Sequence, residues 1–291
     1  AGTLLVLMVR ASALFGWEVY LLSVDRHVPA MPWTNGFFSS YLSPLLHPSY
    51  MAMYATFALA YVLWGQAPVN IGRWRNTWRF VVPCILGVVL CASKAGWLAL
   101  LVVVLYAVFR GDMDPLAKRW LVRGGALAFA TLLAIGATFP TIGKKVTEVW
   151  KCITVGAEPS AEDSSGARRL VWSAARQLVE EHPLLGVGTG DIKNELMSVY
   201  AERSYAYPLE WKLNAHSQVL QSAAALGIPS ALWLLAGLLV PLVYAWRKRQ
   251  HVLVVLLLLS LLNWAVESML EVQAGVVFFS VISALLWRKH G

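Results

Sequence analysis

Charged residues are scarce in this chain, at 14% of its 291 residues, whereas roughly a quarter of the residues of a soluble domain are charged. Hydrophobic residues make up 58% of the chain, and its mean hydropathy is +0.60. This balance excludes an ordinary soluble domain and indicates a polytopic membrane protein. The net charge is +8, but the Lys and Arg residues fall between apolar runs, where they act as topology signals. We therefore expect no nucleic-acid partner.

Cysteine is also scarce, with three residues in the chain. Cys84 and Cys91 lie in one apolar run, and two cysteines seven positions apart in one helix cannot form a disulfide. Cys152 stands alone in a polar segment. No His and Cys residues have the spacing of a zinc site. The sequence thus excludes a disulfide framework and predicts neither a metal site nor a cofactor.

Apolar runs that approach the length of a bilayer crossing recur along the chain. The first run, 3–24, fits weakly because Arg10 and Glu18 interrupt it. Seven further runs are found at 47–64, 80–92, 95–109, 124–139, 219–246, 252–266 and 275–287. The chain enters the first run directly, without the basic stretch and cleavage site of a signal peptide, so we expect further helices upstream. The pattern predicts an all-α polytopic membrane protein with about seven spans in this sequence.

One long polar segment, 140–215, divides the chain into three expected parts. Transmembrane helices occupy 1–139 and 216–291, and the polar segment forms a loop domain between them. If this domain lies outside the cytoplasm, the short inside loops hold 12 Lys and Arg residues, whereas the short outside turns hold only Arg26 and Lys94. Cytoplasmic loops carry the excess of positive charge. The charge distribution therefore predicts an extracytoplasmic loop domain.

Basic side chains gather on this predicted outer side. His216 lies where the polar segment meets the apolar run 219–246. It is either a capping or interfacial residue or a general base at the membrane surface. Lys94 lies in a tight turn and either extends into lipid headgroups or binds a substrate. Arg168 and Arg169 begin a predicted helix, 167–181, and either face solvent or hold phosphate oxygens.

Two carboxylates, Glu267 and Glu271, lie on the same predicted side, between two apolar runs. On one helical face they would suit acid–base chemistry, but we favour a role in orienting the basic residues or in solvating a turn. Cations and a base on one side of a membrane indicate a lipid-phosphate substrate. A transporter would instead carry charges within its spans and internal repeats. Only Arg10 and Glu18 lie within a span, and no repeat is found.

Four stretches of the chain, roughly from Thr34 onward, resemble the O-antigen ligase and O-antigen polymerase family of bacterial inner membranes. Two of them are Thr34-Asn35-Gly36-Phe37 with His47-Pro48-Ser49-Tyr50, and Ser93-Lys94-Ala95-Gly96, in which lysine replaces the usual arginine. The third runs from Arg168 and Trp172 to Pro183-Leu184-Leu185-Gly186-Val187-Gly188. The fourth is His216-Ser217 followed, after nine residues, by Gly227. The third and fourth, in this order, are the most specific.

The resemblance implies a GT-C-type helical bundle with a large periplasmic loop. It further implies a metal-independent glycosyltransferase in the bacterial inner membrane, with its active site facing the periplasm. The donor would be a glycan on undecaprenyl pyrophosphate, and the acceptor a hydroxyl, most simply that of lipid A–core. Carried over by position, His216 would be the general base, and Arg168, Lys94 and Arg169 would bind the pyrophosphate. Because Glu267 lies on the same predicted side, we expect it to support them. A polymerase or a protein O-oligosaccharyltransferase remains the alternative.

Overall fold

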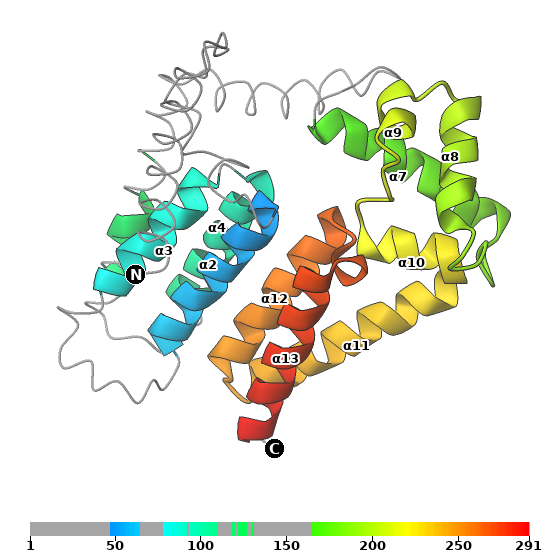
Figure 1. Ribbon diagram of the computed structural model, residues 1–291. Coiled ribbons are helices and arrows are strands. Elements are labelled where there is room, and N and C mark those ends of the chain that lie inside the picture. The colour runs from blue at the N-terminus through cyan, green and yellow to red at the C-terminus, as the bar shows by residue number, and fades with distance from the viewer. Residues whose placement is uncertain are drawn as a thin grey trace, which may run out of the picture. The chain divides into compact units, whose positions relative to one another are not determined.

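The computed structural model describes residues 47–64, 78–91, 93–109, 118–119, 122–126, 130 and 164–290. All regular elements in these residues are helical (Figure 1), as the sequence predicts. The predicted run 3–24 and most of 124–139 lie outside the described residues, as does Cys152. The chain divides into two compact units, Ala1–Gly143 and Lys144–Gly291, and each is treated by itself below.

In the described part of the N-terminal unit, α2 (Pro48–Trp64), α3 (Trp78–Leu90) and α4 (Lys94–Phe109) pack on one another. Buried side chains from all three form its core, namely Ala52, Ala55, Leu59, Val81, Val88, Cys91 and Leu100. Gly96 lies directly against Ala52, and a Cβ at residue 96 would collide with the Cβ of Ala52. Small residues of this kind allow helices of membrane proteins to approach closely.

The hairpin between α3 and α4 turns at Ser93 and Lys94, as the sequence predicts. The Ser93 hydroxyl accepts a hydrogen bond from the Gly96 backbone N–H at 3.2 Å, which satisfies a donor in the first turn of α4. The same hydroxyl lies 3.4 Å from that of Ser49 in α2 and donates to it. Lys94 therefore begins α4 at a turn that is tied to a second helix.

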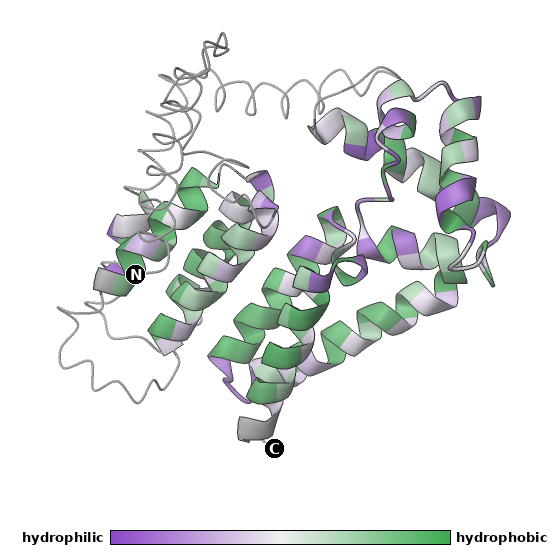
Figure 2. Cartoon of the chain, in the orientation of Figure 1, coloured by the Kyte–Doolittle hydropathy of each residue, from purple (hydrophilic) through white to green (hydrophobic). Residues whose placement is uncertain are grey.

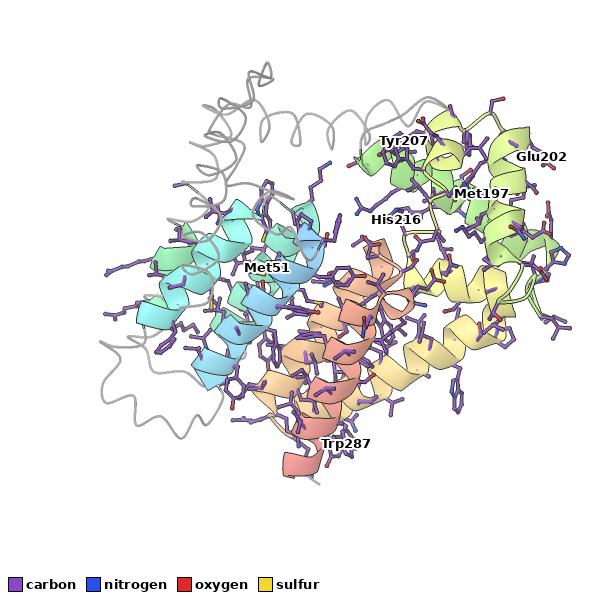
Figure 3. All side chains as sticks on the ribbon, viewed as in Figure 1. Met51, Met197, Glu202, Tyr207, His216 and Trp287 are labelled. Carbon is purple, nitrogen blue, oxygen red and sulfur yellow. The ribbon has the colours of Figure 1, made fainter. Side chains whose placement is uncertain are left out.

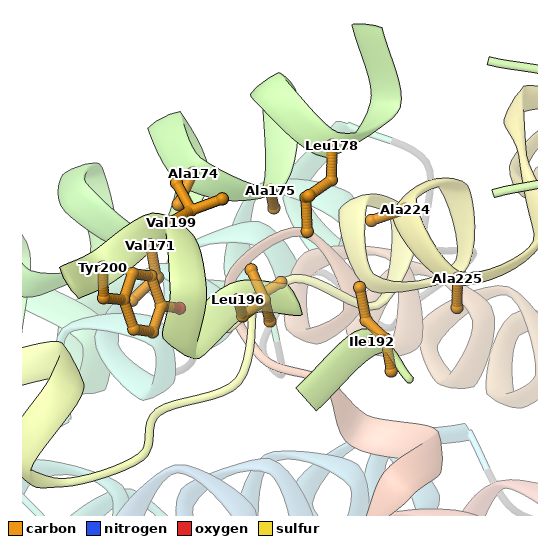
Figure 4. Close-up of a cluster of buried hydrophobic side chains, with 11 residues drawn as sticks. Val171, Ala174, Ala175, Leu178, Ile192, Leu196, Val199, Tyr200, Ala224 and Ala225 are labelled. Atoms are coloured by element: carbon orange, nitrogen blue, oxygen red, sulfur yellow. The ribbon is translucent and has the colours of Figure 1, made fainter. Parts of the chain in front are cut away.

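The described part of the C-terminal unit starts with three helices of the polar segment: α7 (Ser164–Glu181), α8 (Ile192–Glu202) and α9 (Ala206–Glu210). The buried face of α7 repeats at helical spacing, as predicted for 167–181. It packs on α8 and on the following helix, α10 (Gln218–Leu226). Figure 4 shows the resulting core, which consists of Val171, Ala174, Ala175, Leu178, Ile192, Leu196, Val199, Tyr200, Ala215, Ala224 and Ala225. The described part of the polar segment, 164–215, is thus a packed helical layer that shares its core with α10. Its periplasmic location remains a prediction.

The predicted single span 219–246 is wrong, because it consists of two helices. Helix α10 ends at Leu226, Gly227 follows with φ 83° and ψ 167°, and α11 (Ile228–Arg247) starts in a new direction (Figure 1). A positive φ favours glycine. Pro229 lies in the first turn of α11, where a backbone N–H has no partner within the helix, so the N–H that proline lacks is not needed. The glycine and proline signals were present in the sequence, but the uninterrupted hydrophobicity masked them.

Three apolar helices complete the unit: α11, α12 (His251–Val266) and α13 (Gln273–His290), with the short 3₁₀ helix η4 (Met269–Glu271) before α13. Figure 2 shows hydrophobic residues concentrated on these helices and more hydrophilic ones on α7 to α9. In the described part of the chain, α11 alone is long and apolar enough to cross a membrane; α12 and other apolar helices are shorter. The expected number of spans stays a prediction.

Candidate functional site

His216 lies on the connection that enters α10, next to the end of α12 (Figure 3). Its φ is 42°, in the left-handed region, which is uncommon outside glycine although Asn, Asp and His visit it more than most residues. Three neighbours hold this backbone. The His216 N–H donates to Asn214 Oδ1 at 3.0 Å, and its carbonyl accepts from Trp172 Nε1 at 3.2 Å. Ser217 caps the first turn of α10 through Leu220 N.

Glu267 is the residue that links the site together. It follows the last residue of α12, in an extended conformation, and only 8% of its surface is exposed. Its Oε1 lies 3.0 Å from His216 Nδ1, and its Oε2 lies 3.7 Å from a terminal guanidinium nitrogen of Arg168. Burying a carboxylate costs free energy unless it is paired and hydrogen-bonded. Here His216 and Arg168 are its partners.

Arg168 reaches this carboxylate from α7. Its Nε donates to the carbonyl of Val266 at 3.1 Å, so the guanidinium is held at the end of α12 as well as beside Glu267. Trp172 is four residues later and therefore on the same face of α7, which explains why both side chains contact the segment around His216. About a fifth of the Arg168 side chain, 22%, remains exposed. The guanidinium is thus positioned yet still reachable at the surface.

The His216–Glu267 contact determines what the imidazole can do. A carboxylate only accepts hydrogen bonds, so a neutral imidazole beside it would carry its proton on Nδ1 and present the lone pair of Nε2. The side chain is 26% exposed. A carboxylate in this position also stabilises the imidazolium that forms when Nε2 takes a proton. Such an arrangement would suit a general base with an orienting carboxylate, and the Arg168 guanidinium lies beside it.

Polar side chains around this centre fix the ends of α10 and α12. The Gln218 N–H donates to the Glu267 carbonyl at 3.2 Å, and Gln218 Oε1 accepts from Leu270 N at 2.7 Å. Asn214 Nδ2 donates to Glu271 Oε2 at 3.1 Å. The suggestion that Glu267 and Glu271 share a helical face is wrong, because Glu267 is extended and Glu271 ends η4. Glu267 contacts the basic residue His216 and Glu271 contacts Asn214, and the orienting role that we favoured stays a prediction.

The glycines after Pro183 have a structural role that the sequence did not reveal. The N–H groups of Val187 and Gly188 donate to the carbonyls of Ala224 and Ala225, at 2.9 and 2.8 Å. These are carbonyls of the last turn of α10, which otherwise lack helical partners. A Cβ on Gly186 (φ 66°) would collide with the backbone of Ala225. The 183–188 loop therefore docks on the end of α10 and fixes α7 relative to it.

Gly227 completes this contact from the other side. A Cβ at residue 227 would collide with the carbonyl of Leu184, and the Ile228 N–H donates to the Pro183 carbonyl at 2.8 Å. The two most specific sequence stretches thus touch at two places. Arg168 and Trp172 contact the His216 region, and the loop that begins at Pro183 contacts Gly227.

The remaining predicted site residues are placed differently. Arg169 follows Arg168 on α7 and is exposed. Lys94 belongs to the N-terminal unit, at the start of α4. The structure brings Arg168, His216 and Glu267 together, while the part of Lys94 and Arg169 in the site stays a prediction. Among the described residues there is no group of three His, Cys, Asp or Glu side chains able to hold a metal ion.

Comparison with known proteins identifies one family. A family model described as O-antigen ligase matches residues 79–235, which is more than half of the chain. The match includes α3, α4, α7 and α10, and with them Lys94, Arg168 and His216. None of the curated proteins compared with the chain matches it.

Proposed function

Because the chain belongs to the O-antigen ligase family of bacterial inner-membrane glycosyltransferases, we propose that it transfers a glycan from undecaprenyl pyrophosphate to an acceptor hydroxyl, that of lipid A–core in the first instance. The observation that carries this proposal is the hydrogen bond between His216 and Glu267 with Arg168 beside it. A general base and a phosphate-binding cation are the two groups that such a transfer requires.

The chemistry needs one proton transfer and one displacement. His216 Nε2 removes the proton of the acceptor hydroxyl as its oxygen attacks the anomeric carbon of the glycan. The bond between that carbon and the pyrophosphate oxygen breaks, and its electron pair leaves with the pyrophosphate. The attack inverts the anomeric carbon. Glu267 stabilises the imidazolium that results, and general-base catalysis of this kind contributes typically about 10²–10⁴-fold.

The leaving pyrophosphate gains negative charge during the displacement. A guanidinium fork matches phosphate oxygens bidentately, and Arg168 holds such a fork at the edge of the site. Arg169 adds positive charge next to Arg168, and in this proposal Lys94 binds the pyrophosphate as well. Fixed cations stabilise the charge as it develops, and in this mechanism they take the part that a divalent metal plays in other transferases.

The membrane provides the setting for this reaction. With 12 Lys and Arg residues in the short loops of one side, the positive-inside rule favours a periplasmic location for the polar segment and for His216. The site would then meet a lipid-linked donor presented at the periplasmic face. The fold in this proposal is a GT-C-type bundle with the polar helical layer above it.

The test is a transfer assay with purified full-length chain and undecaprenyl-pyrophosphate-linked glycan. Lipid A–core, a second lipid-linked glycan and a pilin-like protein are offered in turn as acceptors, which separates a ligase from a polymerase and from a protein O-oligosaccharyltransferase. We expect transfer to lipid A–core without added metal. A strict dependence on Mg²⁺ or Mn²⁺ would contradict the metal-independent mechanism.

Two variants test the donor site in the same assay. Arg168→Ala should weaken donor binding and transfer strongly, because a positioned guanidinium is lost. Arg169→Ala removes an equal charge from the neighbouring, exposed position and should have the smaller effect. Full donor binding in Arg168→Ala would rule out the proposed pyrophosphate contact.

A further inference from the structure

The loop between α7 and α8 carries two of the most exposed apolar side chains in the described residues. Leu184 is 72% exposed and Leu185 is 83% exposed, although both belong to the polar segment. Single exposed leucines are common on protein surfaces. These two are adjacent, however, and they project from a loop whose backbone is fixed by hydrogen bonds to α10 and α11. Their exposure is therefore a property of the fold.

The leucine pair continues an exposed apolar stripe on α11. The Pro183 carbonyl accepts from Ile228 N, which places the loop at the first residue of α11. Ile228, Leu232, Leu239 and Val243 follow one another at helical spacing along α11, and all are exposed. Leu226 and Trp233 widen the surface at this end, and both are exposed as well. A continuous apolar surface of this extent marks a partner or a membrane.

The dimensions of α11 indicate a membrane. Its 20 residues span about 30 Å at 1.5 Å per residue, which equals the thickness of the hydrocarbon core of a bilayer. Arg247, Lys248 and Arg249 follow at its C-terminal end and mark one boundary of the hydrocarbon. Ile228 then lies at the opposite boundary, and the 183–188 loop beside Ile228 lies there too.

We propose that Leu184 and Leu185 insert into the lipid bilayer beside the first turn of α11, so that the polar helical layer is anchored to the membrane surface. The exposed Trp233, one turn into α11, fits this level, because tryptophan prefers the membrane–water interface. All eight exposed residues named for this surface are apolar, and the occupant to which we commit is lipid. This proposal does not depend on the transferase chemistry.

The anchor also limits how far the candidate site lies from the membrane. Helix α10 has nine residues and is therefore about 13 Å long. The loop docks at its last turn and His216 precedes its first. Whatever the tilt of α10, His216 cannot lie much further than this from the lipid surface. If the chain has the proposed function, on which this step alone rests, this short distance lets a lipid-linked pyrophosphate reach Arg168 without leaving the headgroup region.

The test uses single fluorescent labels on the full chain in vesicles of phosphatidylethanolamine and phosphatidylglycerol. A polarity-sensitive thiol dye is attached in Leu185→Cys, in Leu232→Cys on the α11 stripe, and in Lys193→Cys on the exposed face of α8. The parent chain, which retains its native cysteines, gives the background. Quenching is measured with spin-labelled lipids from within the bilayer and with iodide from the water.

We expect the labels at 185 and 232 to be quenched by the lipids and to be several-fold less sensitive to iodide than the label at 193. Equal iodide quenching at 185 and 193 would overturn the proposal. Protection from iodide at 185 without quenching by lipids would also overturn it, because it would mean that protein covers the leucines. Neither result would bear on the transfer reaction, which is assayed separately.

Discussion

Helix α10 is fixed mainly by side chains at its first turn and by backbone groups at its last turn. At the first turn, Ser217 Oγ donates to the Trp264 carbonyl and Gln218 Oε1 accepts from Leu270 N. At the last turn, the N–H groups of Val187 and Gly188 bond to helix carbonyls. The first kind of contact can be altered one group at a time, because each depends on a single side chain. The second allows only glycine at two positions, where any Cβ meets backbone.

Along this one short helix, the residues of the candidate site lie at one end and the contacts that hold the fold together lie at the other. The candidate site lies at the end where individual polar groups can be exchanged. The end that fixes α7 against α10 tolerates no side chain at Gly186 or Gly227. Substitutions at the first end should therefore change the rate of transfer and leave the fold intact. Substitutions at the second should change stability first.

The largest effect is expected for His216→Asn. Asparagine tolerates the left-handed backbone at this position better than alanine does, but its amide is not a base. The rate of transfer should fall by about 10²–10⁴-fold, with the thermal unfolding temperature in detergent near that of the parent. Alanine is neither a base nor suited to the left-handed backbone. Comparing His216→Ala with His216→Asn therefore separates the loss of the base from strain in the backbone. Transfer by His216→Asn at close to the parent rate would remove the general-base proposal.

Glu267→Gln should come next. The glutamine keeps the shape and still accepts a hydrogen bond from Nδ1, but it no longer stabilises an imidazolium. We expect kcat to fall by about 10²-fold, the lower end of what general-base catalysis contributes, with a smaller change in KM for the acceptor and a change in the pH dependence of kcat. Glu271→Gln is the matched control, since Glu271 contacts Asn214 and not the imidazole. If both variants lose the same activity, Glu267 has no special part in orienting the base.

Gly227→Ala should test the opposite end of the helix. The added methyl group meets the Leu184 carbonyl and also requires a positive φ, so the free energy of unfolding should fall by about 2 kcal/mol or more. Gly237→Ala is the matched control, because a Cβ at residue 237, inside α11, meets nothing within 4 Å. It should be neutral or stabilising by up to about 1 kcal/mol. Thermal unfolding of the two purified variants in the same detergent gives the comparison.

Asn214→Ala should give the smallest change. It removes the acceptor for His216 N and the donor to Glu271, each of which contributes about 0.5–1.5 kcal/mol as a typical hydrogen bond. The site is partly open to solvent, so water replaces part of the loss. We expect a modest drop in rate together with a drop of a few degrees in unfolding temperature. A loss of rate as large as that of His216→Asn would mean that Asn214 itself takes part in the reaction.

The sequence predicted the helices well where hydrophobicity and turn signals agreed. The hairpin at Ser93 and Lys94 and the helical repeat of α7 are examples, and the family followed from short stretches around Arg168 and His216 that the family match later included. The sequence did not reveal the break at Gly227, because an apolar run has the same hydrophobic pattern whether it forms one helix or two. One glycine followed by Ile-Pro was a signal too short to outweigh that run.

The grouping of the site residues was harder to predict than their identity. Arg168, His216 and Glu267 are separated by 48 and 51 positions, and only tertiary packing of α7, α10 and α12 brings them together. The sequence analysis chose Glu267 as a supporting residue, but it did not identify Glu267 as the hydrogen-bond partner of His216, since Glu267 and Glu271 both follow the same apolar run. The docking of the 183–188 loop was hidden for a similar reason. Its bonds are made by backbone groups, which have no signature in side-chain chemistry.

The shared carboxylate of Glu267 has a thermodynamic consequence. Arg168 and His216 each interact with one of its two oxygens, so removing either changes the surroundings of the other. The energies of their substitutions should not be additive, and a double-mutant cycle between Arg168 and His216 should give a coupling energy of about 0.5–3 kcal/mol. The same cycle in a Glu267→Gln background should lose most of that coupling. Departure of the pyrophosphate and removal of the proton would then be energetically coupled through the two carboxylate oxygens of Glu267.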